Sequence, residues 1–95
     1  MCTYITHKIE IDGSGKGAAG WFSVTDASVY VDHPVHAPYA HTVNIDFLNP
    51  ERGPSSRVAL ELTEESALAL VAAIQQALAA APAGLASVHQ VVGAH

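Results

Sequence analysis

The stretch Arg57-Val58-Ala59-Leu60-Glu61-Leu62-Thr63-Glu64-Glu65 decides the fold, because the spacing of apolar residues changes within it. Up to Leu62 every second residue is apolar, the pattern of a strand with one buried face. After Thr63, a good helix N-cap, apolar residues recur at helical spacing, and the two glutamates suit the positive end of a helix dipole. The sequence therefore predicts a strand over 57–62 and then a helix to about Ala81.

Three further strands are predicted upstream from alternation and from β-branched and aromatic content. They cover Thr3–Ile11, Trp21–Asp32 and His41–Leu48. In the second of them the alternation slips near Asp26-Ala27-Ser28, where a bulge would account for it. In the first and third, the odd-numbered residues, His7 and His41 among them, are predicted to face the core.

Two segments rich in turn residues separate these strands. Asp12–Gly20 contains four glycines and is predicted to be a long hairpin loop or a mobile lid. Asn49–Ser56 combines proline, glycine and asparagine and predicts a turn. The predicted order is ββββα: an α+β fold with a four-stranded, mainly antiparallel sheet and one C-terminal helix packed on one face. Residues 1–82 are predicted to form a single domain, and residues 83–95 are predicted to form a tail that is a short strand, an intersubunit arm or disordered.

Composition and charge narrow the class of protein. The chain has 95 residues, a net charge of −5 and only four basic residues, so no basic stripe is present to bind a nucleic acid backbone. The single cysteine cannot form an internal disulfide, and the N-terminus has no export signal, which predicts a cytoplasmic protein. No segment is apolar and long enough to predict a membrane span.

The predicted helix is apolar most of the way round, which favours a second covered side and hence a homodimer or higher oligomer made through this helix. Small alanine side chains would let two such helices approach closely. The alternative is a helix that is rich in alanine for propensity alone. The stripe expected to face the sheet consists of Ala67, Leu70, Val71, Ile74 and Leu78.

Chemistry-bearing residues concentrate in Asp32–His41, which holds three of the six histidines. Two of its residues precede prolines and are therefore extended and stiff. If the core-facing His7 and His41 converge with His33 and His36, the four would provide ligands for a divalent transition metal such as zinc, iron, copper or nickel.

The leading hypothesis is a small metal-dependent enzyme that acts on a small molecule through an open coordination position. Asp32 and Tyr39 are the candidate catalytic residues, because they could orient a ligand or transfer a proton beside the metal. One alternative is a metal-free enzyme in which a histidine paired with a carboxylate acts as general acid and base. The other is a non-enzymatic oligomeric binding or assembly protein.

Four blocks of sequence also carry a family resemblance. They are Met1-Cys2-Thr3-Tyr4-Ile5-Thr6, the glycine-rich run from Gly13 to Gly17 with Gly20-Trp21-Phe22, Asp32-His33-Pro34-Val35-His36-Ala37-Pro38, and Asn44-Ile45-Asp46-Phe47-Leu48-Asn49-Pro50. Together they resemble an uncharacterised family of small bacterial proteins over about residues 1–81. The resemblance implies no activity, cofactor or site residue.

Overall fold

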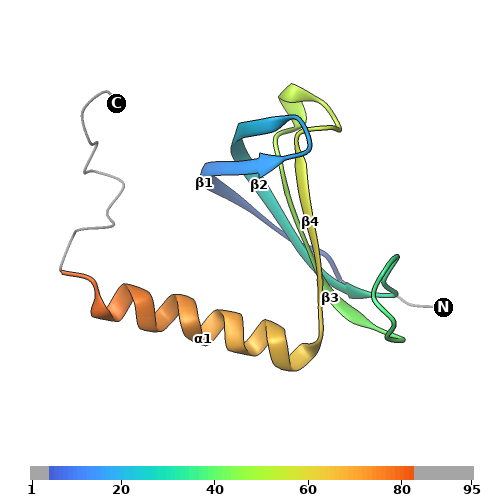
Figure 1. The fold of residues 1–95 in the computed structure, drawn as a ribbon, viewed down its shortest axis with the longest axis vertical. Coiled ribbons are helices and arrows are strands. Elements are labelled where there is room, and N and C mark those ends of the chain that lie inside the picture. The colour runs from blue at the N-terminus through green and yellow to red at the C-terminus, as the bar shows by residue number, and fades with distance from the viewer. Residues whose placement is uncertain (1–4, 83–95) are drawn as a thin grey trace. The chain divides into compact units, whose positions relative to one another are not determined.

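The computed structural model describes residues 5–82, which form one sheet and one long helix (Figure 1). The strands are β1 (His7–Gly17), β2 (Gly20–Asp32), β3 (Thr42–Leu48) and β4 (Arg57–Leu62), with a 3-10 helix η1 (Pro50–Arg52) and the helix α1 (Glu64–Ala80). The sheet is antiparallel with strand order β1-β2-β3-β4. The predicted α+β class and the order of four strands and one C-terminal helix are confirmed.

The chain divides into two compact units, residues 1–64 and residues 65–95, and each is described by itself. The helix α1 begins where the change of spacing predicted it and contains no buried residue. Its packing on the sheet and its part in a dimer stay predictions, and the tail 83–95 lies outside the described residues. Within residues 5–82, no helix has the length and apolar character needed to cross a membrane.

The register of β2, β3 and β4 separates an apolar face from a polar face. Val29 of β2 lies opposite Ile45 of β3, which lies opposite Leu60 of β4. Because facing residues of neighbouring strands share one side of a sheet, these rows build the apolar face. The next row is formed by Tyr30, Asn44 and Glu61 and belongs to the polar face.

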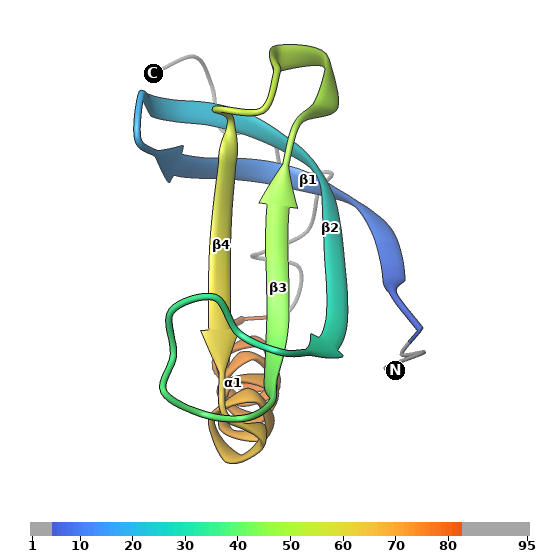
Figure 2. The same ribbon diagram turned by 90° about the vertical axis from the view of Figure 1, so that its right-hand side faces the viewer.

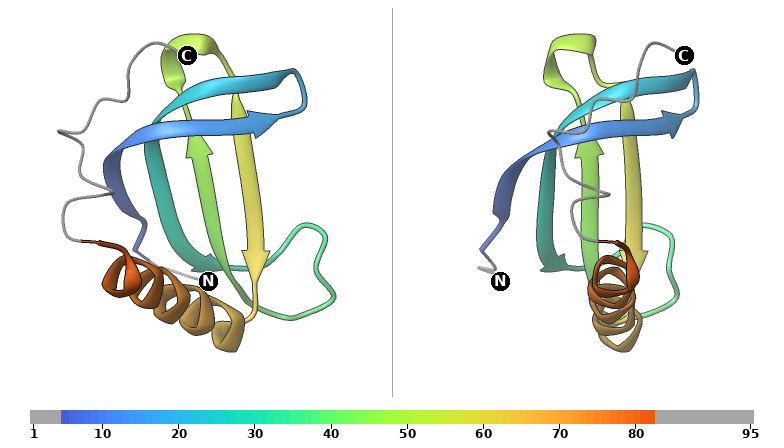
Figure 3. Two further views of the ribbon diagram at one scale, coloured as in Figure 1. Left: turned by 60° about the vertical axis from the view of Figure 1, so that its left-hand side comes forward. Right: turned by 90° about the vertical axis from the view of Figure 1, so that its left-hand side faces the viewer.

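The far end of the β1–β2 hairpin bends across the other two strands (Figures 2 and 3). Figures 2 and 3 show this end of the hairpin crossing the ends of β3 and β4 where the chain turns through η1. The bend brings Val24 of β2 to the same pocket as Phe47 of β3 and Val58 of β4, and three apolar residues of β2 are buried. These are Phe22, Val24 and Ala27, each less than 10 % exposed. The apolar core of the sheet unit therefore lies mainly between the hairpin and the strands that it crosses.

The predicted loop over Asp12–Gly20 is wrong, because strand pairing continues to Gly17 and only Ala18 and Ala19 form the turn. The glycines serve close approach. A Cβ atom on Gly15 would lie 2.9 Å from Val24 Cγ2, closer than side chains pack. A Cβ on Gly17 would lie 3.3 Å from the Arg57 carbonyl oxygen. Glycine here lets two backbones meet and does not loosen the strand.

The register between β1 and β2 shifts between Glu10 and Gly13, opposite Thr25. The first strand has one residue more than its partner across this step, which is the arrangement of a β-bulge. At the same step the buried positions of β2 change from Val24 to Ala27. The irregularity lies beside the position where the slip in alternation predicted it.

Candidate functional site

The residues 33–41 between β2 and β3, here called the strap, cross the ends of β3 and β4 on one side of the sheet (Figure 2). One carboxylate of β4 holds the strap. Glu61 accepts hydrogen bonds from the backbone N–H groups of Val35 at 2.5 Å, His36 at 3.0 Å and Ala37 at 2.9 Å. Three successive amides aimed at one carboxylate form a small anion-binding nest. Within the described part of the chain, the occupant of this nest is Glu61 itself.

These hydrogen bonds favour the ionised form of Glu61. The amide of Val35 lowers the pKa of the carboxyl most, the amide of Ala37 comes next, and burial opposes them. The folded pKa of Glu61 therefore lies below its ordinary value. At neutral pH the carboxylate is charged, and the strap stays fastened.

The base of the strap is held by His33. Its backbone N–H donates to Asp32 Oδ1 at 2.7 Å, and its ring Nδ1 lies 2.9 Å from the Ala40 carbonyl oxygen. Because a carbonyl oxygen only accepts, Nδ1 carries the proton, and a neutral ring then has its lone pair on Nε2. The ring of His33 also contacts that of His41, with centroids 4.5 Å apart and planes tilted by 34°.

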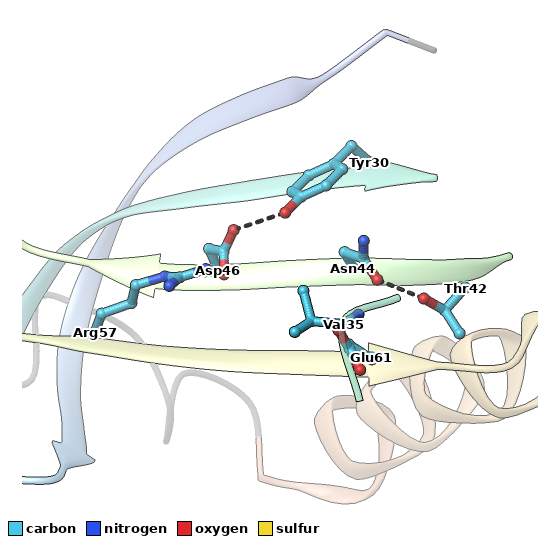
Figure 4. A network of polar contacts seen from close by, with 7 residues as sticks. All are labelled: Tyr30, Val35, Thr42, Asn44, Asp46, Arg57 and Glu61. Atoms are coloured by element: carbon cyan, nitrogen blue, oxygen red, sulfur yellow. Dashed lines mark hydrogen bonds and ion pairs between the residues drawn. The ribbon is translucent and has the colours of Figure 1, made fainter. Parts of the chain in front are cut away.

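Two polar side chains of β3 are buried beside Glu61 (Figure 4). Thr42 is 2 % exposed and Asn44 is 6 % exposed, and the Thr42 hydroxyl donates to Asn44 Oδ1 at 2.6 Å. Polar groups buried in this way are tolerated because each finds a hydrogen-bond partner. The polar face at this end of the sheet is therefore a covered layer with satisfied hydrogen bonds.

A second polar cluster lies further along the same face. Tyr30 donates a hydrogen bond to Asp46 at 3.2 Å, and Arg57 Nη2 forms an ion pair with the other oxygen of Asp46 at 2.7 Å (Figure 4). Burial, followed by the charge of Asp46, raises the pKa of the Tyr30 phenol. The phenol is accordingly a hydrogen-bond donor at neutral pH.

The structure brings together some of the predicted site residues and leaves others apart. His33 and His41 touch, but both are exposed, so the prediction that His41 faces the core is wrong. His7 is exposed on β1 opposite Val29, so its predicted burial is also wrong. The edge position of β1 leaves this residue with one neighbouring strand.

The remaining predicted residues lie on or beside the strap. His36 contributes its backbone N–H to Glu61, Asp32 accepts a hydrogen bond at the start of the strap, and Tyr39 is 56 % exposed. In residues 5–82, no three or more histidine, cysteine, aspartate or glutamate side chains are arranged to hold a metal ion. The predicted meeting of four histidines is therefore not what the described residues form.

An apolar pocket, here called the hairpin pocket, has a volume of about 390 Å³ and opens where the bent hairpin meets β3 and β4. Gly15 belongs to its wall, and a Cβ at that position would lie 3.8 Å from Val58. Polar groups are few. The lining residues are Ile11, Gly13, Ser14, Gly15, Lys16, Trp21, Val24, Phe47 and Val58.

Two residues central to these sites were not singled out from the sequence. Glu61 occupies an ordinary outward position of an alternating strand, and its spacing carries no signal for the nest that it fills. Gly15 was assigned to a flexible loop. The adjoining aromatic pair Trp21 and Phe22 was the available signal that the glycine run lies against a packed region.

Fold and site together define a small α+β protein with a four-stranded antiparallel meander, a fastened strap and an apolar pocket. The chain belongs to the family of unknown function DUF6295, whose family model matches residues 1–87. This confirms the resemblance to an uncharacterised family. No curated protein and no solved structure is significantly similar to the chain.

Proposed function

We propose that the protein binds a small, largely apolar molecule in the hairpin pocket. The observation that carries this proposal is the mainly apolar pocket itself, whose wall includes Gly15, Val24, Phe47 and Val58. A pocket of about 390 Å³ lies within the range of small-molecule sites, roughly 300–1,000 Å³. Its apolar lining with a few polar groups is typical of such sites.

The chemistry of the lining indicates the kind of ligand. Val24, Phe47 and Val58 offer dispersion contacts and no hydrogen bonds, so affinity comes from apolar surface. The rim includes Ser14 and Lys16, which suit a ligand with one polar or anionic end. Binding of such a ligand needs no cofactor. The proposal also includes a cytoplasmic location for the protein.

Trp21 makes the proposal directly measurable, because it lines the pocket and is the one tryptophan of the chain. The dye anilinonaphthalene sulfonate, which is apolar with one anionic group, serves as the probe. We expect energy transfer from Trp21 to bound dye with saturable, stoichiometric binding. A Gly13→Val substitution should narrow the pocket without a clash at Cβ, because Gly13 belongs to the lining and a Cβ there meets no atom within 4 Å.

Ser23→Val is the matched control, since Ser23 lies on the neighbouring strand and outside the lining. Loss of dye binding in Gly13→Val with retention in Ser23→Val supports the proposal. Equal binding by wild type and Gly13→Val, with both folded by circular dichroism, would contradict it.

A second candidate is the predicted metal-dependent activity, favoured by the contact between His33 and His41. The rings of His33 and His41 would supply two nitrogen ligands for a transition metal. Elemental analysis of protein purified without a His-tag tests it. Stoichiometric metal that is lost in His41→Ala supports this candidate, and substoichiometric metal under metal-replete conditions would exclude it.

A further inference from the structure

The outer edge of β4 has the properties of an interaction surface. Among residues 5–82, β4 pairs along one side only, with β3. An edge strand presents unpaired N–H and C=O groups that another strand can bind. The opposite edge differs, because β1 carries Lys8, Lys16 and a register irregularity, which are common protections against strand addition. Residues 57–62 contain neither lysine nor proline.

A groove of about 460 Å³ runs along this edge. Its lining includes Ala59 and Glu61 from the polar face of β4 together with Leu60 and Leu62 from the apolar face. A cavity lined from both faces of one strand lies at the edge of the sheet and not on either surface. Val35 of the strap closes one end.

The sequence of β4 is complementary to itself. In an antiparallel pair centred on Ala59, each Arg57 lies opposite Glu61 of the second copy, and each Val58 lies opposite Leu60 of the second copy. Opposite charges and apolar pairs that face each other across two strands are both stabilising. The charged pairs fall on the polar face and the apolar pairs on the apolar face, so both faces continue across the junction.

We propose that β4 of one chain pairs antiparallel with β4 of a second copy about a twofold axis at Ala59. The two four-stranded sheets become one continuous sheet of twice the width. This interface satisfies the edge groups of both strands and extends the small apolar face of each copy. It is distinct from a dimer made through α1.

Ala59→Lys tests the interface. Ala59 is exposed, so a lysine is accommodated in the single chain, but two lysines would meet at the axis of the dimer. We expect a dimer for wild type and a monomer for Ala59→Lys by sedimentation equilibrium. Ala19→Lys, at the exposed turn of the hairpin, is the matched control and should remain dimeric.

Rescue makes the test specific to the axis. Ala59→Glu alone should also be monomeric, whereas an equimolar mixture of Ala59→Lys and Ala59→Glu should form a heterodimer, because opposite charges then meet. Hydrogen exchange should show protection of β4 amides that increases with wild-type concentration. A monomeric wild type would overturn the proposal. A dimer that persists in Ala59→Lys would also overturn it, and this is the result expected for a dimer made through α1.

Discussion

The bent hairpin, which forms the hairpin pocket, and the strap cover the two faces of one sheet by opposite means. On the apolar face, Gly15 and Gly17 bring backbone against packed side chains, so the fit depends on the absence of atoms. On the polar face, Glu61 and the Thr42–Asn44 pair hold the chain by hydrogen bonds, so the fit depends on charge and donors. The comparison teaches that added volume should damage the first face, whereas removal of a polar group should damage the second.

The largest effect is expected from Gly15→Val. Its Cβ would lie 2.9 Å from Val24 Cγ2, and overpacking of this kind lowers the free energy of unfolding by about 1–3 kcal/mol or more. Gly13→Ala is the control, because its Cβ meets nothing within 4 Å and should change stability by less than about 0.5 kcal/mol. Urea denaturation followed by circular dichroism measures both. If the two variants are equally stable, close packing at Gly15 does not determine the stability of the apolar face.

A somewhat smaller loss is expected from Asn44→Ala on the other face. The substitution leaves the buried Thr42 hydroxyl without its acceptor, and an unsatisfied buried group costs about 1–3 kcal/mol. The double variant Thr42→Val with Asn44→Leu removes both polar groups and should recover part of this loss. Urea denaturation again gives the comparison. If the double variant loses more free energy of unfolding than the two single substitutions lose together, hydrogen bonding does not govern the stability of this face.

The smallest and most local effect is expected from Glu61→Gln. The lowered pKa of Glu61 means that its contribution to holding the strap is complete above the ordinary carboxyl pKa and is lost as the pH falls through the lower folded value. At neutral pH the amides of residues 35–37 should exchange faster in Glu61→Gln than in wild type. Below the folded pKa the two proteins should exchange alike, after correction for intrinsic rates.

Hydrogen exchange with peptide-level mass spectrometry measures this difference, and the amides of the β1–β2 hairpin serve as the internal control. They should be unchanged in Glu61→Gln at every pH. Slow exchange of residues 35–37 in the variant at neutral pH would show that the strap is held by other contacts.

The arrangement of strands was predictable because one face of the sheet is apolar. Val43, Ile45 and Phe47 alternate as expected and lie on that face, and the change of spacing after Leu62 places the start of α1. The glycine run was predicted wrongly for a physical reason. Local propensity treats glycine as a turn residue, whereas the close approach of Val58 to Gly15 involves a residue distant in sequence.

The site was less predictable than the fold. Alternation assigned His41 to the core, but this residue precedes β3, and the buried positions that follow are the polar Thr42 and Asn44. Prediction from alternating apolar residues assumes that only one face of the strand is buried. In β3, polar residues on the other face are buried as well. The partnership of Glu61 with the amides of 35–37 bridges more than twenty residues, and alternation along one strand contains no information about it.

The strand order β1-β2-β3-β4 has a kinetic consequence. Each strand pairs with its neighbour in sequence, so the ladder can grow one hairpin at a time and needs only short loops to close. Docking of the Gly15 segment beside Val58 is the long-range step, because it joins residues at opposite ends of the sheet unit. Pairing of successive strands should therefore be fast, with consolidation of the apolar pocket as the later and slower event of folding.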